Sequence, residues 1–371
     1  MNSSVALAGS ALRVADAGAK DRVSALDGLR TIAAACVVGM HSGIPYFTGG
    51  FIGVDIFFVL SGYLITTVLV AEYERFERVD LLAFYGKRAL RLYPLLLIFA
   101  LVCFPGLAIA YGTMSAFGEV WPTLGYVTNL VRGTGLPTVL GHSWSLSLEV
   151  QFYIVWPIVL VPALKLIGKR TTAISMLIGA VVVAAWRWHL FDMDVNWTRV
   201  YDWPDVHSDG LMIGCALALT PRAAMLKIAR MLPIAVAVIV SFVVSVKWLD
   251  AAAYHGGILA VNLAAATVIA SVITKPASLL STILAQPSMA WLGKVSYGVY
   301  LWHYPVLFLS PILFPEHTIL FTVAVSISIS ALTYHFVELP AMRYGKAMDN
   351  RTLGLLMLAA VTLSIAVVFL T

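Results

Sequence analysis

One imidazole and three carboxylates lie in apolar stretches of this chain: His41, Asp55, Glu149 and Asp209. Ionisable side chains at membrane depth are costly unless they are paired or face water, so residues of this kind are candidates for function. An imidazole beside a carboxylate suits general-base chemistry, because it titrates near neutral pH and the carboxylate can set its tautomer. Packing within a helix bundle explains His41 equally well. Asp55 and Asp209 would also serve as helix caps or as partners of cations.

The spacing of these residues predicts where they meet. Arg30 precedes His41 by eleven positions. At about 100° per residue a helix places both on one face, about 16 Å apart along its axis. A short turn leads into the stretch that holds Asp55, so a hairpin would bring His41 and Asp55 to similar depth. Glu149 and Asp209 lie near the same end of their own apolar stretches, and we expect four helices to converge there.

A second group of charges is expected at the opposite end of the same helices. Arg88 and Arg91 are three residues apart, which places them on one helix face. With Arg30 they could bind phosphates through their planar guanidinium groups. Anchoring at the cytoplasmic surface explains Arg88 and Arg91 equally well. A cationic end and a histidine end would together suit group transfer from a phosphorylated carrier.

Composition decides what kind of chain positions these residues. Of 371 residues, 60% are hydrophobic and 12% are charged, against about 45–50% and about 25% in soluble domains. These values exclude a soluble enzyme, a disordered chain and a nucleic-acid-binding module. A bilayer core needs about 20 apolar residues per helix. We therefore expect an all-α polytopic membrane protein with about 10–11 transmembrane helices, embedded in the cell inner or plasma membrane.

Basic residues predict the orientation. Most Lys and Arg fall in segments on the same side as the N-terminus, which places that terminus in the cytoplasm. The net charge of +5 reflects this bias and indicates no anionic partner. The apolar stretches expected to span lie near 24–44, 51–71, 88–111, 144–164, 171–190, 205–220, 231–249, 256–274, 295–314, 317–337 and 353–371.

The chain is expected to consist of a tail, a membrane domain and a C-terminal segment. Residues 1–22 are expected to be a flexible cytoplasmic tail without a cleavable signal peptide, and residues 23–340 a membrane domain. Residues 341–371 are expected to add a cytoplasmic loop and an extra C-terminal transmembrane helix. The longest non-spanning stretch, 112–143, would lie on the outer face. It could cap a cavity, bind an acceptor or form an interfacial aromatic belt.

Several other sites find little support in the sequence. The three cysteines are not spaced as a metal site or a disulfide framework, and no zinc-protease motif occurs. We therefore expect no metal, and the lack of a G-x-S-x-G motif argues against a hydrolase elbow. His142 could be an N-cap neighbour or a ligand. His303 is expected to be structural, at a helix break caused by Pro305.

Five short blocks together suggest a family. In order they resemble signature blocks of the acyltransferase-3 family of integral membrane O-acyltransferases, and the resemblance runs from about residue 22 to 340. The blocks are R-x10-H from Arg30 to His41, GGFIGVDIFFVLSG at 49–62, KRALRLYP at 87–94, WSLSLEVQFY at 144–153 and SYGVYLWH at 296–303.

The resemblance implies an acyltransferase that moves groups other than aminoacyl groups, here an acetyl or other short acyl group. The donor would be cytoplasmic acyl-coenzyme A, in practice acetyl-CoA, used as a substrate with no permanently bound cofactor. The acceptor would be a hydroxyl of a carbohydrate, polysaccharide or glycolipid. His41 would act as general base or acyl carrier, with Glu149 and Asp55 as catalytic partners. Substrate-binding roles are implied for Arg30, Arg88, Arg91, Asp27, Trp144, Tyr153 and Asp209.

The chain departs from the family pattern at two positions. Many members carry a second Glu where this chain has Val150, and many have Arg where it has His207. Some members add an SGNH esterase-like domain after the last helix. Its absence from this sequence favours the compact subgroup that modifies exopolysaccharide, lipopolysaccharide or macrolides.

Two other functions remain alternatives. Intramembrane Arg, His, Asp and Glu would also suit a proton-coupled transporter of a sugar or an acyl donor. Such transporters are often built from internal repeats, and none is visible here. A non-catalytic subunit of a polysaccharide export machine would give Arg30 and His41 no reason to share a helix face.

Overall fold

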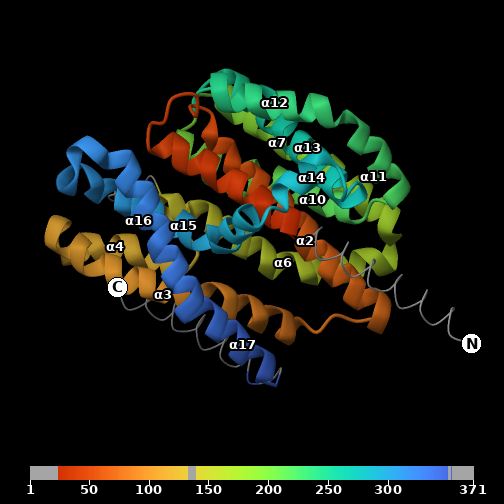
Figure 1. Cartoon of the computed structure of the whole chain (residues 1–371). Helices are drawn as coiled ribbons and strands as arrows, with labels where there is room; N and C mark the ends of the chain where they lie inside the picture. The colour runs from red at the N-terminus through yellow and green to blue at the C-terminus, as the bar shows by residue number, and fades with distance from the viewer. Residues whose placement is uncertain (1–23, 133–138, 350–351, 353–371) are drawn as a thin grey trace, which may run out of the picture.

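The computed structural model describes residues 24–132, 139–349 and 352, and every regular element within these ranges is a helix (Figure 1). The expectation of an all-α protein is confirmed. A first helix covers residues 24–41. The remaining elements are η1 (Gly50–Ile52), α2 (Gly53–Phe76), α3 (Leu81–Tyr111), α4 (Thr113–Leu124), α5 (Thr128–Val131), η2 (Gly141–Ser143), α6 (Trp144–Leu166), α7 (Gly168–Asp192), α8 (Trp197–Asp202), α9 (Pro204–His207), α10 (Asp209–Ala218), α11 (Arg222–Ile228), η3 (Ala229–Met231), α12 (Leu232–Ser245), η4 (Ala253–Gly257), α13 (Ile258–Thr274), α14 (Leu279–Leu284), α15 (Pro287–Leu313), η5 (Pro315–His317), α16 (Thr318–Thr333), η6 (Tyr334–Glu338) and α17 (Leu339–Ala347).

Within the described residues, seven helical stretches are long and apolar enough to cross a membrane. This number is lower than expected from the sequence. The helices over 24–41 and α15 match two expected spans but are not among the seven. The expected span at 205–220 contains α10, which has only 10 residues. The expected span at 353–371 and the expected tail at 1–22 lie outside the described residues.

Two connecting segments contain helices. Within the stretch 112–143, which was expected not to span, α4 and α5 form, and α4 packs along α3 (Figure 1). Gly112, with φ +87°, makes the turn between α3 and α4, a conformation that glycine adopts without strain. After residue 340, α17 occupies the start of the expected loop.

The helix over 24–41 approaches its neighbours closely, which brings functional side chains together. A Cβ at Gly293 of α15 would lie 1.8 Å from the carbonyl oxygen of Asp27, and one at Gly53 of α2 would lie 2.2 Å from that of Ala33. Only glycine fits at such contacts, a common device for tight helix packing in membranes. Two glycines therefore hold the helix that carries Arg30 and His41 against α2 and α15.

α2 lies within the bundle and contacts α6, α10 and α13 (Figure 1). Its most apolar stretch is 72% buried, against 28% for α3 and for α6. A helix that is apolar around its whole circumference is expected at the centre of such a bundle rather than at its surface. α2 consequently contributes side chains to both of the cavities described below.

Candidate active site

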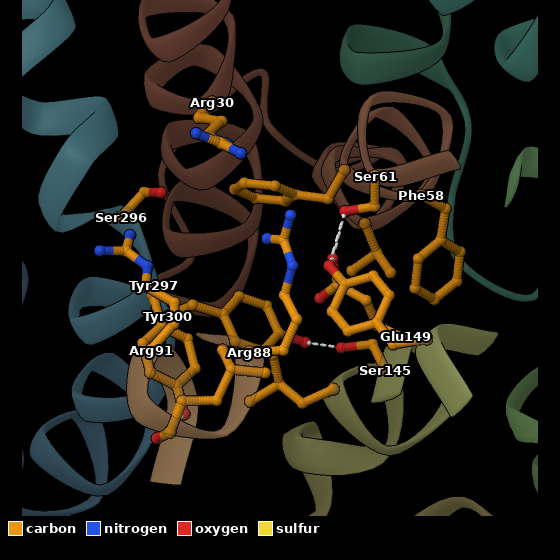
Figure 2. A pocket seen from close by; sticks show the side chains of 15 residues that line it. Arg30, Phe58, Ser61, Arg88, Arg91, Ser145, Glu149, Ser296, Tyr297 and Tyr300 are labelled. Carbon is orange, nitrogen blue, oxygen red and sulfur yellow. Dashed lines mark hydrogen bonds between the residues drawn. The ribbon is translucent and has the colours of Figure 1, made fainter. Parts of the chain in front are cut away.

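Three arginines line a cavity of about 770 Å³, which we call the arginine chamber. Arg30 comes from the helix over 24–41, and Arg88 and Arg91 come from α3. Figure 2 shows Arg88 extending into the centre of the group, with Arg30 above it and Arg91 to the left, and Tyr297 and Tyr300 line the same cavity. The structure therefore brings together the three cations that the sequence placed at one end of the helices.

The three arginines differ in how their charge is compensated. Nη1 of Arg30 lies 2.8 Å from Oδ1 of Asp27, and Nη1 of Arg91 lies 3.4 Å from Oε2 of Glu338. Within the described residues Arg88 has no ion pair or hydrogen bond, and its guanidinium instead stacks on Phe84 and Tyr153. Arg88 is thus the cation of this chamber most available to bind an anion.

Glu149 belongs to the arginine chamber rather than to the surroundings of His41. Ser61 and Tyr153 both donate hydrogen bonds to its Oε1. The guanidinium carbon of Arg88 lies 5.7 Å from the centre of the Tyr153 ring. Glu149 therefore fixes Tyr153, and Tyr153 in turn supports Arg88 by a cation–π contact.

His41 lies in a second cavity of about 630 Å³, which we call the histidine chamber. The residues that line it are mostly aromatic, with two histidines and one arginine among them: Val37, Met40, His41, Phe51, Val54, Arg132, His142, Trp144, Tyr201, Trp248, Tyr300 and Tyr304. Val54 and Tyr300 also line the arginine chamber. The two chambers meet at these two side chains.

Tyr300 is held firmly where the chambers meet. Its hydroxyl donates to the carbonyl oxygen of His142 at 2.9 Å and accepts from Ser145, with the two oxygens 2.6 Å apart (Figure 2). Both partners lie at the start of α6, so these bonds join α15 to α6. The phenol ring is buried and forms part of the boundary between the chambers.

His41 is oriented by another histidine. Its Nδ1 lies 3.0 Å from Nε2 of His303, whose own Nδ1 lies 2.7 Å from the carbonyl oxygen of Tyr300. A carbonyl oxygen only accepts, so Nδ1 of His303 carries the proton and its Nε2 accepts from Nδ1 of His41. This assignment leaves the lone pair of His41 on Nε2, ready to accept a proton from a substrate.

His142 is the second imidazole of the histidine chamber. Pro305 has no N–H, so it leaves the carbonyl of Leu301 without its helical partner. Nε2 of His142 donates to that oxygen at 3.1 Å. Its Nδ1 then carries a lone pair and is buried without a hydrogen-bond partner among the described residues. Helix α15 continues through Pro305, so the break expected at that residue does not form.

The expected convergence of His41 with three carboxylates is not found. Oδ1 of Asp55 lies 3.0 Å from Nε2 of His207, and both residues are fully buried. Asp209 makes two 2.9 Å contacts with Arg187. Depth counted along a sequence does not give the rotation of each helix, and Asp55 and Asp209 face α9 and α7 rather than His41.

His207 explains one departure from the family pattern. Its Nδ1 lies 2.6 Å from the carbonyl oxygen of Tyr201 and its Nε2 meets Asp55. Because the carbonyl can only accept, the Asp55–His207 pair holds one more proton than a neutral histidine and a carboxylate would. In this chain His207 is the buried partner of Asp55, and it contacts Tyr201 in the wall of the histidine chamber.

The remaining candidates are placed as follows. Trp144 lines the histidine chamber, Tyr153 lines the arginine chamber, and Asp27 contacts that chamber through Arg30. Asp209 lines neither. Sequence reasoning missed Tyr300, Arg132 and the role of His303. The sequence His303-Tyr304-Pro305, directly after Trp302, was the available signal for His303, whereas nothing in the sequence pointed to Arg132.

Burial affects two carboxyl groups outside the spanning helices. Glu119 of α4 accepts a hydrogen bond from the backbone N–H of Leu140 at 2.7 Å, and burial raises its pKa to about 7. Burial likewise raises the pKa of Asp202 to about 7, although Arg132 beside it opposes the shift. In both cases removal from water disfavours the charged form more than nearby donors or cations favour it.

No metal site emerges from the described residues, where no group of three or more His, Cys, Asp or Glu side chains could hold an ion. Arg30, Arg88, Arg91 and Glu149 line the arginine chamber, whereas His41, His142 and Arg132 line the histidine chamber. The arrangement can bind an anion at one end and accept a proton at the other.

Comparison with known proteins identifies the family. Residues 23–338 match the family described as an acyltransferase domain, and the chain belongs to it. The peptidoglycan O-acetyltransferase OatA of Listeria monocytogenes is 33% identical over 357 residues, which cover 87% of this chain and 56% of that protein. YrhL of Bacillus subtilis, named as a candidate peptidoglycan O-acetyltransferase, is 35% identical, with 87% and 55% covered.

A third relative, the O-acetyltransferase OatA of Staphylococcus aureus, is 29% identical, with 86% of this chain and 57% of that protein covered. The chain thus spans just over half the length of these curated relatives. No solved structure matches it significantly.

Proposed function

We propose that this chain is a membrane O-acyltransferase that moves an acetyl group from acyl-coenzyme A to a hydroxyl of a carbohydrate acceptor. The donor binds in the arginine chamber and the acceptor in the histidine chamber. The proposal extends to this chain the acyl transfer for which its relatives are named. A peptidoglycan-type sugar polymer is the acceptor class that their names favour.

The observation that carries the proposal is that the two chambers adjoin. Both are lined by Val54 and Tyr300, and one continuous helix carries Arg30 in one chamber and His41 in the other. Eleven residues of helix separate Arg30 and His41 by about 16 Å. An extended pantetheine arm, with phosphates at one end and a thioester at the other, suits a path of this form.

The donor end is proposed to work through Arg88. Guanidinium groups bind phosphate oxygens through two parallel hydrogen bonds, and such charge-assisted bonds are stronger than neutral ones. Arg30 and Arg91 already face Asp27 and Glu338. Arg88 would therefore contribute most of the affinity for the coenzyme's phosphates. With this end on the cytoplasmic side, as the Lys and Arg bias predicts, acetyl-CoA is available to it.

The reacting end is proposed to work through His41 as a general base. Nε2 of His41 takes the proton of the acceptor hydroxyl as its oxygen attacks the thioester carbonyl. The new C–O bond forms, the C–S bond breaks, and the imidazolium returns its proton to the departing thiolate. His303 keeps the lone pair on Nε2 by accepting the Nδ1 proton of His41. Asp55 and Glu149 support Tyr201 and Arg88 rather than the imidazole.

The test is release of coenzyme A from acetyl-CoA by purified protein in nanodiscs, with candidate sugar acceptors. We expect acceptor-dependent release by wild type, loss of at least about a hundredfold in His41→Ala, and weaker donor binding in Arg88→Ala. Leu97→Ala, at an exposed position of α3, is the matched control and should behave as wild type. Full activity of His41→Ala would refute the assigned base. If donor binding and release were both absent, the transporter alternative would gain support.

A further inference from the structure

Arg132 is the one permanently charged side chain among the described residues that line the histidine chamber. The reactants of the acyl transfer proposed above bring no full negative charge to this position. The reacting hydroxyl is neutral, and the phosphates of the donor belong to the other chamber. The charge therefore needs a separate explanation, either in the fold or in the ligand.

Pairing with Asp202 compensates the charge only weakly. Nη1 of Arg132 lies 3.3 Å and 3.4 Å from the two carboxylate oxygens of Asp202, and no other side-chain hydrogen bond of Arg132 occurs within the described residues. The fully buried pair Arg187–Asp209 makes two bonds of 2.9 Å. Distances of about 2.7–2.9 Å are usual for charge-assisted bonds. Arg132 is thus held far less tightly than the structural arginine of the same protein.

The ionisation of Asp202 also indicates that the charge of Arg132 is only partly compensated. Its carboxyl is fully buried, and its pKa is raised to about 7, so a substantial fraction is neutral near neutral pH. The guanidinium of Arg132 also rests on Trp197, with 4.8 Å from its central carbon to the ring centre. Trp197 packs in turn against Trp248 of the chamber wall. The cation is therefore fixed in position while its charge is only partly neutralised.

A second unsatisfied group lies in the same chamber. His142 is 4% exposed, and its Nδ1 has no hydrogen-bond partner among the described residues. Its other nitrogen is committed to the carbonyl of Leu301. A buried acceptor without a partner is costly, and a ligand hydroxyl would satisfy it.

The rest of the wall is aromatic. Trp144, Tyr201, Trp248 and Tyr304 present flat apolar surfaces with few polar atoms. Ligand sites of this kind bind apolar faces against the rings and use a few polar groups to set orientation. Sugar rings have such apolar C–H faces together with hydroxyl groups at their edges.

We propose that the acceptor is an anionic carbohydrate, with a carboxylate or phosphate group bound by Arg132 and a hydroxyl bound by His142. The sugar ring lies against the aromatic wall, and the reacting hydroxyl points to His41. This inference rests on the proposed acyl transfer and narrows its acceptor to one chemical class.

The test compares matched acceptors in the coenzyme A release assay. N-acetylglucosamine is the neutral probe, N-acetylmuramic acid carries a carboxylate, and N-acetylglucosamine 1-phosphate carries a phosphate. Wild type should use at least one anionic probe with about tenfold higher kcat/KM than the neutral one, the factor of a charge-assisted hydrogen bond. The anionic probe with the higher kcat/KM shows whether Arg132 binds a carboxylate or a phosphate.

Variants locate the preference. Arg132→Gln should lower kcat/KM for the anionic probe about tenfold more than for the neutral probe, and Arg132→Lys should keep part of the preference. Arg199→Gln is the control, since Arg199 lies on the same helix as Asp202 but outside the chamber. If Arg132→Gln fails to fold, the double variant Arg132→Gln/Asp202→Asn is used in its place. It removes both charges together and so leaves no buried carboxylate without its partner.

The outcomes separate this inference from the proposed function. Turnover of the neutral probe without any anionic preference in wild type would overturn the inference and leave acyl transfer standing. A preference retained in Arg132→Gln or in the double variant would also overturn it. Failure of every acceptor to release coenzyme A would count against the proposed function itself.

Discussion

Nδ1 of His41 lies 3.0 Å from Nε2 of His303, and the two imidazole rings are stacked. The histidines are 262 residues apart in the sequence and meet because Gly293 lets α15 approach the helix over 24–41. The carbonyl of Tyr300 fixes the tautomer of His303, and His303 fixes that of His41. A backbone oxygen and a second imidazole thus do what an aspartate does for the histidine of a serine protease.

His303 is therefore predicted to act as a positioning residue. His303→Phe should lower kcat by at least about tenfold, because His41 loses the acceptor that holds its Nδ1 proton, while the KM values for donor and acceptor change little. His303→Gln, which can still accept a hydrogen bond, should recover part of the rate. Equal rates for Phe and Gln variants, or a pH profile of kcat identical to wild type in His303→Phe, would show a purely structural role.

The three arginines of the arginine chamber should not contribute equally. Arg88→Gln is expected to weaken coenzyme A binding by about tenfold or more, since Arg88 lacks a carboxylate partner. Arg30→Gln should have a smaller effect on binding, because Arg30 is already paired with Asp27 at 2.8 Å. Isothermal titration of coenzyme A into each purified variant gives the dissociation constants. The reverse order would contradict this division of roles.

Tyr300 is predicted to control passage between the chambers. Tyr300→Trp adds bulk where the chambers meet and should reduce acyl transfer severely while coenzyme A still binds. Tyr300→Phe keeps the ring and loses the bonds to Ser145 and His142, so it should retain most activity with lower thermal stability. Measurement of binding and turnover on the same preparations separates these effects. Normal turnover in the Trp variant would mean that the acyl group takes another path.

Glu119 should make stability depend on pH. Its pKa is raised by burial to about 7 in the folded protein, from an ordinary value of 4.5. A carboxyl with a raised pKa stabilises the fold fully below its unfolded pKa, and this contribution is lost as pH rises through about 7. Asp202, with a pKa also raised to about 7, acts in the same direction.

The corresponding measurement is thermal unfolding in detergent between pH 5 and 9. The midpoint of wild type should fall between about pH 5 and 7 and level off above that, and Glu119→Gln, which cannot ionise, should reduce that fall. Glu316→Gln at an exposed site of η5 is the control and should follow wild type. An unchanged slope in Glu119→Gln would show that Glu119 does not carry this dependence.

The sequence predicted the features that depend on periodicity and composition. The helical fold, the shared chamber of Arg30, Arg88 and Arg91, and the position of His41 eleven residues from Arg30 all follow from helix geometry. The partners of buried charges could not be predicted, because they depend on helix rotation and on contacts between distant segments. Asp55 meets His207, 152 residues away, and Glu149 meets Ser61, 88 residues away.

Proline chemistry misled the sequence analysis at His303. Pro305 indicated a helix break, yet α15 continues because His142 binds the carbonyl that the proline leaves free. His142 lies 159 residues before Leu301 in the chain, so the sequence around Pro305 does not reveal this contact. Arg132 was missed for a similar reason, since its segment reads as a loop and its place in the histidine chamber arises only from tertiary packing.

The central claim is that an acyl group passes between the two chambers and meets its acceptor at His41. The direct measurement uses proteoliposomes with labelled acetyl-CoA enclosed inside and a sugar acceptor outside. The account predicts labelled acceptor outside for wild type, and none for His41→Ala with coenzyme A binding retained. Transfer only when donor and acceptor share one side, or undiminished transfer by His41→Ala, would contradict it.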